Sequence, residues 1–251
     1  NRYQKKIGSL LWAAVNTRPD VAFAVSRLGR FSHNPSSQHH EAADRVIRYL
    51  VATRTLALQY GGQEPEEDFV IASDASFADN SIDRKSSQAY SIKIFGGLTM
   101  WSANKQDTVT TSTTEAELLA LAQAAKEGFF VSRLLHALTV RFDDKTLRIQ
   151  CDNQQTIRLV EAEVAQLKTK LKHVDIHNHW LRQEVENGTL RIIYTPTDEI
   201  FADGFTKALQ GDKFKTFLNQ IGLADIPERL EERRFKELQD EDIVNLAFGV
   251  D

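Results

Sequence analysis

Residues 69–74 read Phe-Val-Ile-Ala-Ser-Asp, a short apolar run that ends in a serine and an aspartate. Such a run predicts a buried β-strand ending at Asp74, and the alternation of side chains over residues 89–95 predicts a second strand. Gly96-Gly97 then predicts a tight hairpin into a third strand over residues 98–103. These three strands would form the antiparallel beginning of a sheet.

Helices and strands alternate after this hairpin. Ser112-Thr113-Thr114 predicts the start of a long helix, with Glu117 in the capping-box position relative to Thr114. Apolar periodicity and the breakers Gly188 and Pro196 predict a strand over 147–151, helices over 157–160 and 172–187, a strand over 190–194 and a helix over 199–207. A meander followed by strands that helices separate predicts an α/β fold, a mixed sheet with helices on its faces.

The first 60 residues have a helical pattern instead. Apolar residues recur at helical spacing from Ile7 to Val15, Pro19 suits the first turn of a second helix, and Ser36-Ser37 suits the N-cap of a third. Residues 56–60 allow a short strand, and the acidic, proline-containing segment 63–68 predicts a domain boundary. We therefore predict a helical region over 1–62, an α/β domain over 67–224 and an acidic tail over 225–251 whose apolar spacing allows a helix.

The composition restricts the class of protein. Of 251 residues, 41% are hydrophobic and 26% are charged, which excludes a disordered chain. No apolar run approaches the ~18 residues of a membrane span, so no membrane partner is expected. The single cysteine, Cys151, can form neither an internal disulfide nor a multi-cysteine zinc site, and it indicates a reducing compartment. Residues 1–60 carry a net charge of +6 and residues 61–251 carry −10, which favours a polyanionic partner for the first part and a metal site in the second.

Four acidic residues occupy positions where this topology brings distant segments together: Asp74, Glu117, Asp152 and Asp203. Strand ends and helix starts meet at one edge of an open α/β sheet, where ligands commonly bind. Carboxylates held that close repel one another unless cations balance them. Hard divalent cations suit oxygen ligands, so we predict two Mg²⁺ ions, for which Mn²⁺ can substitute. The simpler alternative is that each acid serves separately as a turn residue or helix cap.

The same acids lie in four longer motifs: Ser73-Asp74-Ala75, residues 112–117 (Ser-Thr-Thr-Glu-Ala-Glu), residues 151–154 (Cys-Asp-Asn-Gln) and residues 202–207 (Ala-Asp-Gly-Phe-Thr-Lys). In this order they resemble the ribonuclease H domain that ends the polyprotein of Ty1/copia-type retrotransposons. Residues 7–11, 17–25, 83–86 and 172–176 resemble further copia-type segments, so the likeness extends over roughly residues 3–223.

The resemblance implies a ribonuclease H-like fold with a five-stranded sheet, three antiparallel strands followed by two parallel ones. It implies that Asp74, Glu117, Asp152 and Asp203 are the catalytic, metal-binding tetrad of a two-metal endoribonuclease that hydrolyses the RNA strand of RNA/DNA hybrids. The N-terminal helices would then be the thumb or connection region of the reverse transcriptase, and the polymerase part of the same polyprotein would be a partner. The expected location is the cytoplasmic retrotransposon particle, with the nucleus as a second one.

Glu115 competes with Glu117 for the second place in the tetrad. Because the two lie two residues apart on a helix, their side chains point in different directions. Glu117-Leu118-Leu119-Ala120 resembles the Glu-Leu-x-Ala pattern of ribonucleases H, so we predict Glu117 as the ligand and Glu115 as a cap. The sequence departs from the family at Phe77, at Gly204 and in residues 195–202, which lack the loop histidine that assists product release in many relatives.

Recognition of the hybrid calls for small polar groups near the metals and cations further out, since an RNA-containing helix exposes 2′-hydroxyls in a shallow groove. The candidates are Asn104, Ser112, Thr113, Asn153 and Gln154 for the first role, and Arg84, Lys85, Lys168, Lys170 and Lys172 for the second. The alternative is an ordinary solvated surface. His173 and His177 have zinc-ligand spacing, but no cysteine or obvious carboxylate completes the set, so helix packing or phosphate contact is preferred.

Two other functions remain open at this point. One is a non-catalytic nucleic-acid-binding module, either domesticated or dependent on a partner, which the basic N-terminal region and the acidic tail motivate. The other is a related two-metal nuclease or integrase that acts on DNA. A glutamate on the helix directly after a three-stranded meander favours ribonuclease H over the integrases, which usually supply their glutamate from a late helix.

Overall fold

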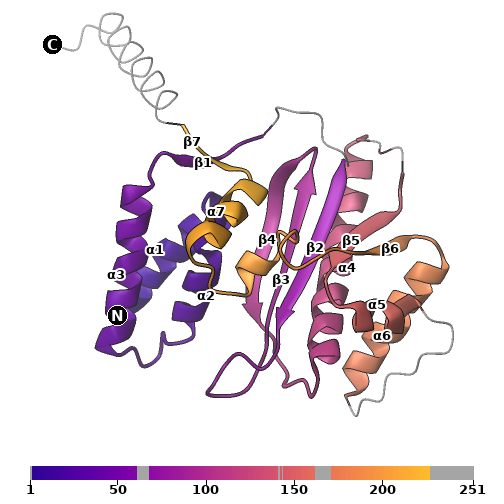
Figure 1. Ribbon diagram of the computed structural model, residues 1–251, viewed down its shortest axis with the longest axis horizontal. Helices are drawn as coiled ribbons and strands as arrows, with labels where there is room; N and C mark the ends of the chain where they lie inside the picture. Colours follow the sequence, from indigo (N-terminus) through magenta and orange to yellow (C-terminus); the bar gives the residue numbers. More distant parts are fainter. Residues whose placement is uncertain (1, 61–67, 141, 143, 162–170, 227–251) are drawn as a thin grey trace, which may run out of the picture.

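A computed structural model describes residues 2–60, 68–140, 142, 144–161 and 171–226 (Figure 1). At its centre is a five-stranded sheet of order β4-β3-β2-β5-β6. The strands are β2 (Phe69–Ser76), β3 (Ser87–Ile94), β4 (Gly97–Lys105), β5 (Leu147–Cys151) and β6 (Leu190–Tyr194). β2, β3 and β4 pair antiparallel, whereas β5 runs parallel to both β2 and β6. The predicted ribonuclease H-like sheet, with three antiparallel strands followed by two parallel ones, is confirmed.

The turn between β3 and β4 explains why the meander forms where the sequence predicted it. Phe95 and Gly96 both have positive φ angles, 49° and 77°, as a two-residue hairpin turn requires. β4 begins at Gly97, where a side chain would collide with the ring of Tyr60. The hairpin therefore depends on both glycines, one for its backbone conformation and one for space.

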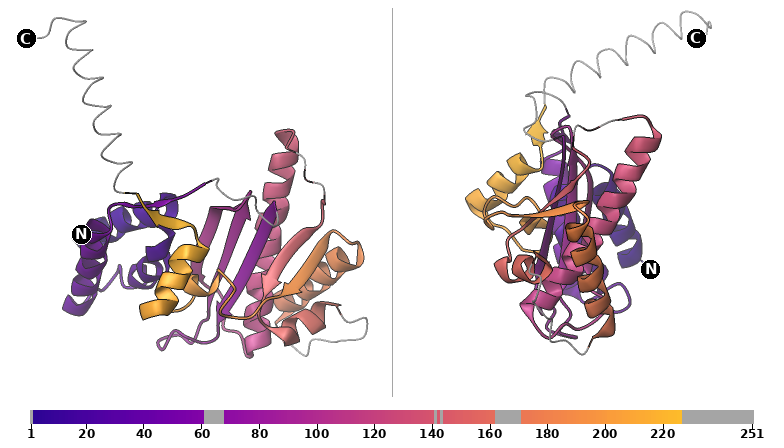
Figure 2. Two further views of the ribbon diagram at one scale, coloured as in Figure 1. Left: turned by 45° about the horizontal axis from the view of Figure 1, so that its top comes forward. Right: turned by 90° about the vertical axis from the view of Figure 1, so that its right-hand side faces the viewer.

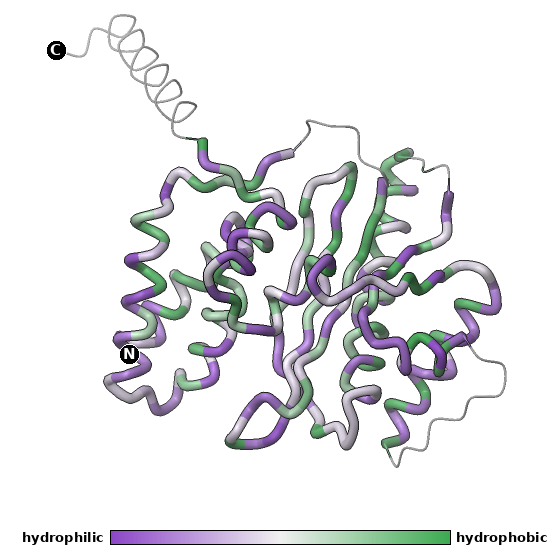
Figure 3. Tube along the Cα trace, viewed as in Figure 1, coloured by the Kyte–Doolittle hydropathy of each residue, from purple (hydrophilic) through white to green (hydrophobic). Residues whose placement is uncertain are grey.

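Helices cover both faces of the sheet (Figure 2). α4 (Thr113–Ala137) and α6 (Lys172–Glu186) cover one face, and α5 (Gln154–Glu161) packs against both of them. Their apolar side chains share a buried cluster with Ile71, Ile92 and Ile149 of the strands. The opposite face is covered by the 3₁₀ turn η2 (Asp203–Phe205) and by α7 (Gly211–Gln220). The hydropathy trace shows the corresponding apolar positions along the central strands (Figure 3).

The N-terminal helices share a core with this second face. They are α1 (Arg2–Asn16), the 3₁₀ turn η1 (Pro19–Val21), α2 (Ala22–Gly29) and α3 (Ser37–Ala52). One hydrophobic cluster contains Tyr3 and Leu10 of α1, Ala72 of β2 and Phe217 of α7. The indole nitrogen of Trp101 in β4 also donates a hydrogen bond of 2.8 Å to the Ala14 carbonyl. The division into domains stays a prediction, but the packing joins the predicted parts closely.

A second sheet of two strands joins the segment after α3 to the last described residues. β1 (Leu56–Leu58) pairs antiparallel with β7 (Leu223–Asp225). The predicted tail thus begins with a residue of β7, Asp225, and its positions from 227 onward lie outside the described residues. Among the described helices none is both long and apolar enough to cross a membrane.

The predicted helix over 199–207 is wrong. Only the 3₁₀ turn η2 forms there, and the next helix is α7, which the sequence analysis did not predict. The reason is burial: Ile200, Phe201 and Ala202 are consecutive and all less than 5% exposed. A surface helix buries one stripe of side chains, so three successive buried residues favour an irregular turn pressed into the core.

Candidate metal centre

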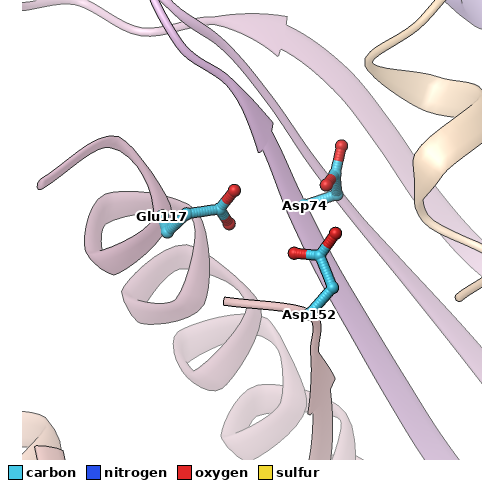
Figure 4. A group of neighbouring side chains, drawn as sticks. All are labelled: Asp74, Glu117 and Asp152. Carbon is cyan, nitrogen blue, oxygen red and sulfur yellow. The ribbon is translucent and has the colours of Figure 1, made fainter. Parts of the chain in front are cut away.

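Strand register places the first two acids beside each other. In the parallel pair of β2 and β5, Ala72 lies opposite Gln150. Asp74 lies two residues after Ala72 and is still in β2. Asp152 lies two residues after Gln150 and directly follows β5. The carboxyl ends of neighbouring parallel strands meet at one edge of the sheet, so these two carboxylates lie together (Figure 4).

The start of α4 supplies the glutamate. Ser112 is the N-cap, and its hydroxyl accepts a hydrogen bond of 3.2 Å from the Glu115 amide. The Glu115 carboxylate accepts from the amide and the hydroxyl of Thr111, at 2.6 and 2.8 Å. The cap is therefore formed by Ser112 and Glu115, and the predicted capping pair of Thr114 and Glu117 is wrong. Glu117 is left to point toward the two aspartates (Figure 4).

Asp74, Glu117 and Asp152 form a compact group. One carboxylate oxygen from each lies within 4.8 Å of the others. Asp74 is 1% exposed and Glu117 is 3% exposed. Asp203 lies outside this group of three but next to it: Lys207 forms an ion pair with Asp203 and lies 3.5 Å from Asp74 Oδ1. The structure thus brings three of the four predicted acids together and connects the fourth through a lysine.

Burial and repulsion shape the charges of the group. Burial raises the pKa of Asp74 to about 6, although Lys207 and Thr206 act in the opposite direction. Burial and the charges of Asp74 and Asp152 raise the pKa of Glu117 well above its usual range. Burial would lower the pKa of Lys207, but the charge of Asp74 and the hydrogen bond to Asp203 outweigh it and raise that pKa. The group is therefore short of positive charge.

Three neighbours that the sequence analysis did not assign hold the carboxylates in place. The hydroxyl of Thr206 donates to Asp74, and the hydroxyl of Thr197 donates to Asp152 Oδ2 at 2.7 Å. Lys207 is the third. The available signal for Thr206 and Lys207 was their place in the same short motif as Asp203. The contact of Thr197 with Asp152 could not be predicted from the sequence, because the two residues are distant along the chain and only the fold brings them together.

Gly204, a departure from the family pattern, has a packing role. A Cβ atom at this position would lie 2.5 Å from two ring carbons of Phe217. The Phe217 ring is 2% exposed and packs edge-to-face on Phe205. The missing side chain thus allows α7 to press against η2, the turn that carries Asp203.

The donor set suits a hard divalent cation. Asp74 Oδ1 and Glu117 Oε2 are buried and accept no hydrogen bond from the described part of the chain. Such orphaned carboxylate oxygens are costly unless a cation binds them. Oxygen ligands of this kind match Mg²⁺ and Mn²⁺. Among the described residues, this group of potential ligands consists of the three carboxylates and does not include Cys151, whose thiol pKa is raised by burial and by the charge of Glu117.

The predicted nucleic-acid contacts have mixed surroundings. Ser112 and Asn153 act as helix caps, since the Asn153 side chain accepts from the Thr156 amide at 2.9 Å. Asn104 at the end of β4, Thr113, Gln154, Lys172 and the loop residue Arg84 are exposed, and Lys85 is half-buried. Lys168 and Lys170 lie outside the described residues. These assignments stay predictions.

The histidines do not form a zinc site in the described residues. The acidic trio is the one cluster of potential ligands found there. His173 Nε2 lies 3.2 Å from the Thr108 hydroxyl and so links α6 to the segment before α4. This contact agrees with the preferred interpretation of helix packing.

Comparison with known proteins places the chain among retrotransposon sequences. It is 35% identical over 223 residues to the retrovirus-related Pol polyprotein from transposon TNT 1-94 of Nicotiana tabacum, a match that covers 88% of this chain and 16% of that protein. It is 33% identical over 227 residues to the Pol polyprotein from transposon RE1 of Arabidopsis thaliana, covering 90% and 15% respectively. The chain thus spans about one-sixth of the length of these relatives.

Other comparisons add little. No protein-family profile matches the chain. Among solved structures, the N-terminal RNase H domain of a Mycobacterium tuberculosis protein aligns with a TM-score of 0.41 at 10% identity, covering 61% of this chain and 98% of that one. The topology of the sheet, the acidic trio and the Pol relatives lead to one conclusion: the chain belongs to the Ty1/copia-type retrotransposon Pol polyproteins and has a ribonuclease H-like fold.

Proposed function

We propose that this chain is a Mg²⁺-dependent ribonuclease H that hydrolyses the RNA strand of RNA/DNA hybrids and leaves 3′-hydroxyl and 5′-phosphate ends. The observation that carries the proposal is the trio of carboxylates from β2, α4 and the end of β5, in which one oxygen from each lies within 4.8 Å of the others. Two oxygens of the trio, Asp74 Oδ1 and Glu117 Oε2, are buried without a hydrogen bond from the described residues. Within the polyprotein it would work beside the polymerase part, in the cytoplasmic particle and in the nucleus.

The chain's own residues would hold the ions and the substrate in fixed positions. Asp74, Glu117 and Asp152 would bind divalent ions, with Asp203 completing the site on the Lys207 side. When bound, two Mg²⁺ ions activate the attacking water and stabilise charge on the leaving oxygen. Thr206 fixes the rotamer of Asp74, and Thr197 fixes that of Asp152. Such support matters because metal ligands work only when neighbouring groups orient them.

The test is hydrolysis of an end-labelled RNA/DNA hybrid in Mg²⁺, compared with single-stranded RNA and duplex DNA. We expect the chain to cleave the hybrid and to leave single-stranded RNA and duplex DNA intact. Asp74→Asn should lower the rate by at least ~100-fold, because loss of a metal ligand removes several kcal/mol of transition-state stabilisation. Asp212→Asn, an exposed position on α7 that pairs with Lys215, is the matched control and should cut at the wild-type rate.

Three results would refute the proposal. An Asp74→Asn variant that cuts as fast as the wild type would remove the metal site from the mechanism. Binding of the hybrid without cleavage in Mg²⁺ or Mn²⁺ would favour a non-catalytic nucleic-acid-binding module instead. Cleavage of duplex DNA would indicate the integrase-like alternative.

A further inference from the structure

Lys207 is the cation of the acidic site. Its ammonium group forms an ion pair with Asp203 and lies 3.5 Å from Asp74 Oδ1. Among the described residues, no other ion pair involves any of the four acids. One positive charge therefore faces Asp74 and Asp203, while the described residues form no ion pair with Glu117 or Asp152.

The backbone keeps Lys207 in this position. Its amide donates to the Asp203 carbonyl at 3.1 Å, so the two side chains project from one turn of chain. The preceding residue, Thr206, is 1% exposed and donates to Asp74. The side chain of Lys207 is 38% exposed, so part of it contacts solvent.

Space for movement lies next to the site. Lys207 also lines an apolar pocket of about 530 Å³ between α2, α3 and α7, whose wall includes Leu209, Phe214 and Tyr49. A lysine stem can lie along such a surface while its charged end stays in water. The ammonium group can therefore leave the acids without any change in the fold.

We propose that Lys207 is a built-in counter-ion that occupies the Asp74–Asp203 side of the site in the metal-free protein and withdraws when a second divalent ion binds. This inference rests on the metal site of the proposed function. It makes the two ion positions unequal: an ion held by Asp74, Glu117 and Asp152 meets uncompensated carboxylates, whereas an ion between Asp74 and Asp203 must displace an ammonium group. Lys207 thereby sets the order in which the ions bind.

The experiment is a titration of the metal-free protein with Mn²⁺, without nucleic acid, by calorimetry and electron paramagnetic resonance. We expect one ion to bind the wild type at least ~10-fold more tightly than the second, since displacing a paired charge costs more than 1.4 kcal/mol. Lys207→Met should raise the affinity for the second ion at least ~10-fold and should lower the melting temperature in EDTA. Lys207→Arg keeps the positive charge, so it should still bind the first Mn²⁺ ion more tightly than the second.

The control is Lys215→Met, which removes an exposed lysine from a similar pair with Asp212 on α7. It should leave both affinities and the melting temperature unchanged. If Lys207→Met leaves both Mn²⁺ affinities within twofold of the wild type, the inference is wrong. It is also wrong if the variant only raises the KM for the hybrid, because Lys207 would then contact the substrate. Should Lys207→Met fail to fold, Lys207→Gln gives the same comparison.

The Mn²⁺ titration and the hybrid-cleavage assay can fail independently of each other. A chain that binds Mn²⁺ in the expected pattern but cuts no hybrid would refute the nuclease and leave the counter-ion in place. A chain that cuts the hybrid with affinities unaffected by Lys207→Met would do the opposite.

Discussion

Two buried aspartates in this molecule have opposite surroundings. Asp20, 8% exposed, accepts two hydrogen bonds from the Arg18 guanidinium at 3.0 and 2.7 Å and one from the Tyr49 hydroxyl at 2.7 Å. The Arg18 guanidinium also donates hydrogen bonds to the carbonyl and the hydroxyl of Thr53. Asp74 is even more buried, yet its Oδ1 accepts no hydrogen bond in the described part of the chain, and two further carboxylates lie beside it.

The difference indicates a structural role for Asp20 and a ligand-binding role for Asp74. At Asp20 every charge is matched, and the network joins η1 to α3, which accounts for Thr17-Arg18-Pro19-Asp20 among the family-like motifs. At Asp74 a single ammonium group, that of Lys207, faces several carboxylates, so negative charge is left in excess at a cost to stability. Such an excess is typical of a site that awaits a ligand. A buried acid is thus informative about function only after its partners have been counted.

The largest expected effect concerns the free energy of unfolding of the two asparagine variants. Asp20→Asn should destabilise the protein by about 3–5 kcal/mol, because it leaves the buried Arg18 charge unpaired. Asp74→Asn should instead leave the stability of the metal-free protein unchanged or increase it, because it relieves repulsion with Glu117 and Asp152. Urea unfolding in EDTA measures both. Equal destabilisation by the two substitutions would contradict the contrast.

The second effect is a pH dependence of stability at the Asp74 site. The pKa of Asp74 is raised to about 6 in the folded protein from an ordinary value of 3.8. Between these values the folded state holds a proton that the unfolded chain has released, so stability is complete below about pH 4 and falls as the pH rises through about 6. The loss is roughly 3 kcal/mol at 1.36 kcal/mol per unit. The raised pKa of Glu117 acts in the same direction.

The measurement is the free energy of unfolding from pH 4 to pH 8 in EDTA. The difference between the wild type and Asp74→Asn should grow with pH over this range, and added Mg²⁺ should remove it. Asp20→Asn serves as the control for the loss of a buried carboxylate and should be less stable than the wild type throughout this range. Parallel curves for Asp74→Asn would show that its carboxyl titrates normally.

The smallest effect compares the two hydroxyl donors. Tyr49→Phe removes a donor to Asp20 and Thr206→Val removes one to Asp74, so each should cost about 1–3 kcal/mol in EDTA. Saturating Mg²⁺ should recover most of the loss in Thr206→Val, because an ion would take over the charge of Asp74. It should recover nothing in Tyr49→Phe. Thermal unfolding with and without Mg²⁺ tests this, and identical responses of the two variants would count against a metal at Asp74.

Much of the fold was predictable because local signals and packing agree. The β6 strand and the end of α6 before Gly188 lie where periodicity and turn chemistry predict them. The hairpin turn lies one residue earlier than predicted, at Phe95-Gly96, and Gly97 already belongs to β4. Residues 199–207 were mispredicted because tertiary burial overrode a helical pattern, and β7 was missed because three residues acquire strand structure only by pairing with β1. α7 was overlooked as well, although its amphipathic pattern was visible.

The acids of the candidate site were predictable for a different reason. Asp74, Glu117 and Asp152 each lie at the start or end of a regular element, and topology alone brings such positions together. The hydroxyl of Thr197 and the ammonium of Lys207 come from irregular chain around η2, where no periodicity specifies direction. Glu117 lies with the two aspartates and Glu115 caps the helix, because residues two apart on a helix cannot share one target. The role of Glu117 as a metal ligand stays a prediction.

The pairing of β1 with β7 bears on how this protein can be divided. A fragment limited to residues 67–224 would lose Leu56–Leu58, strip β7 of its hydrogen-bonding partner and remove the N-terminal helices from the apolar cluster that they share with Ala72, Leu98 and Phe217. Exposing part of that cluster should make the fragment prone to aggregation, so the smallest piece worth purifying includes the N-terminal helices.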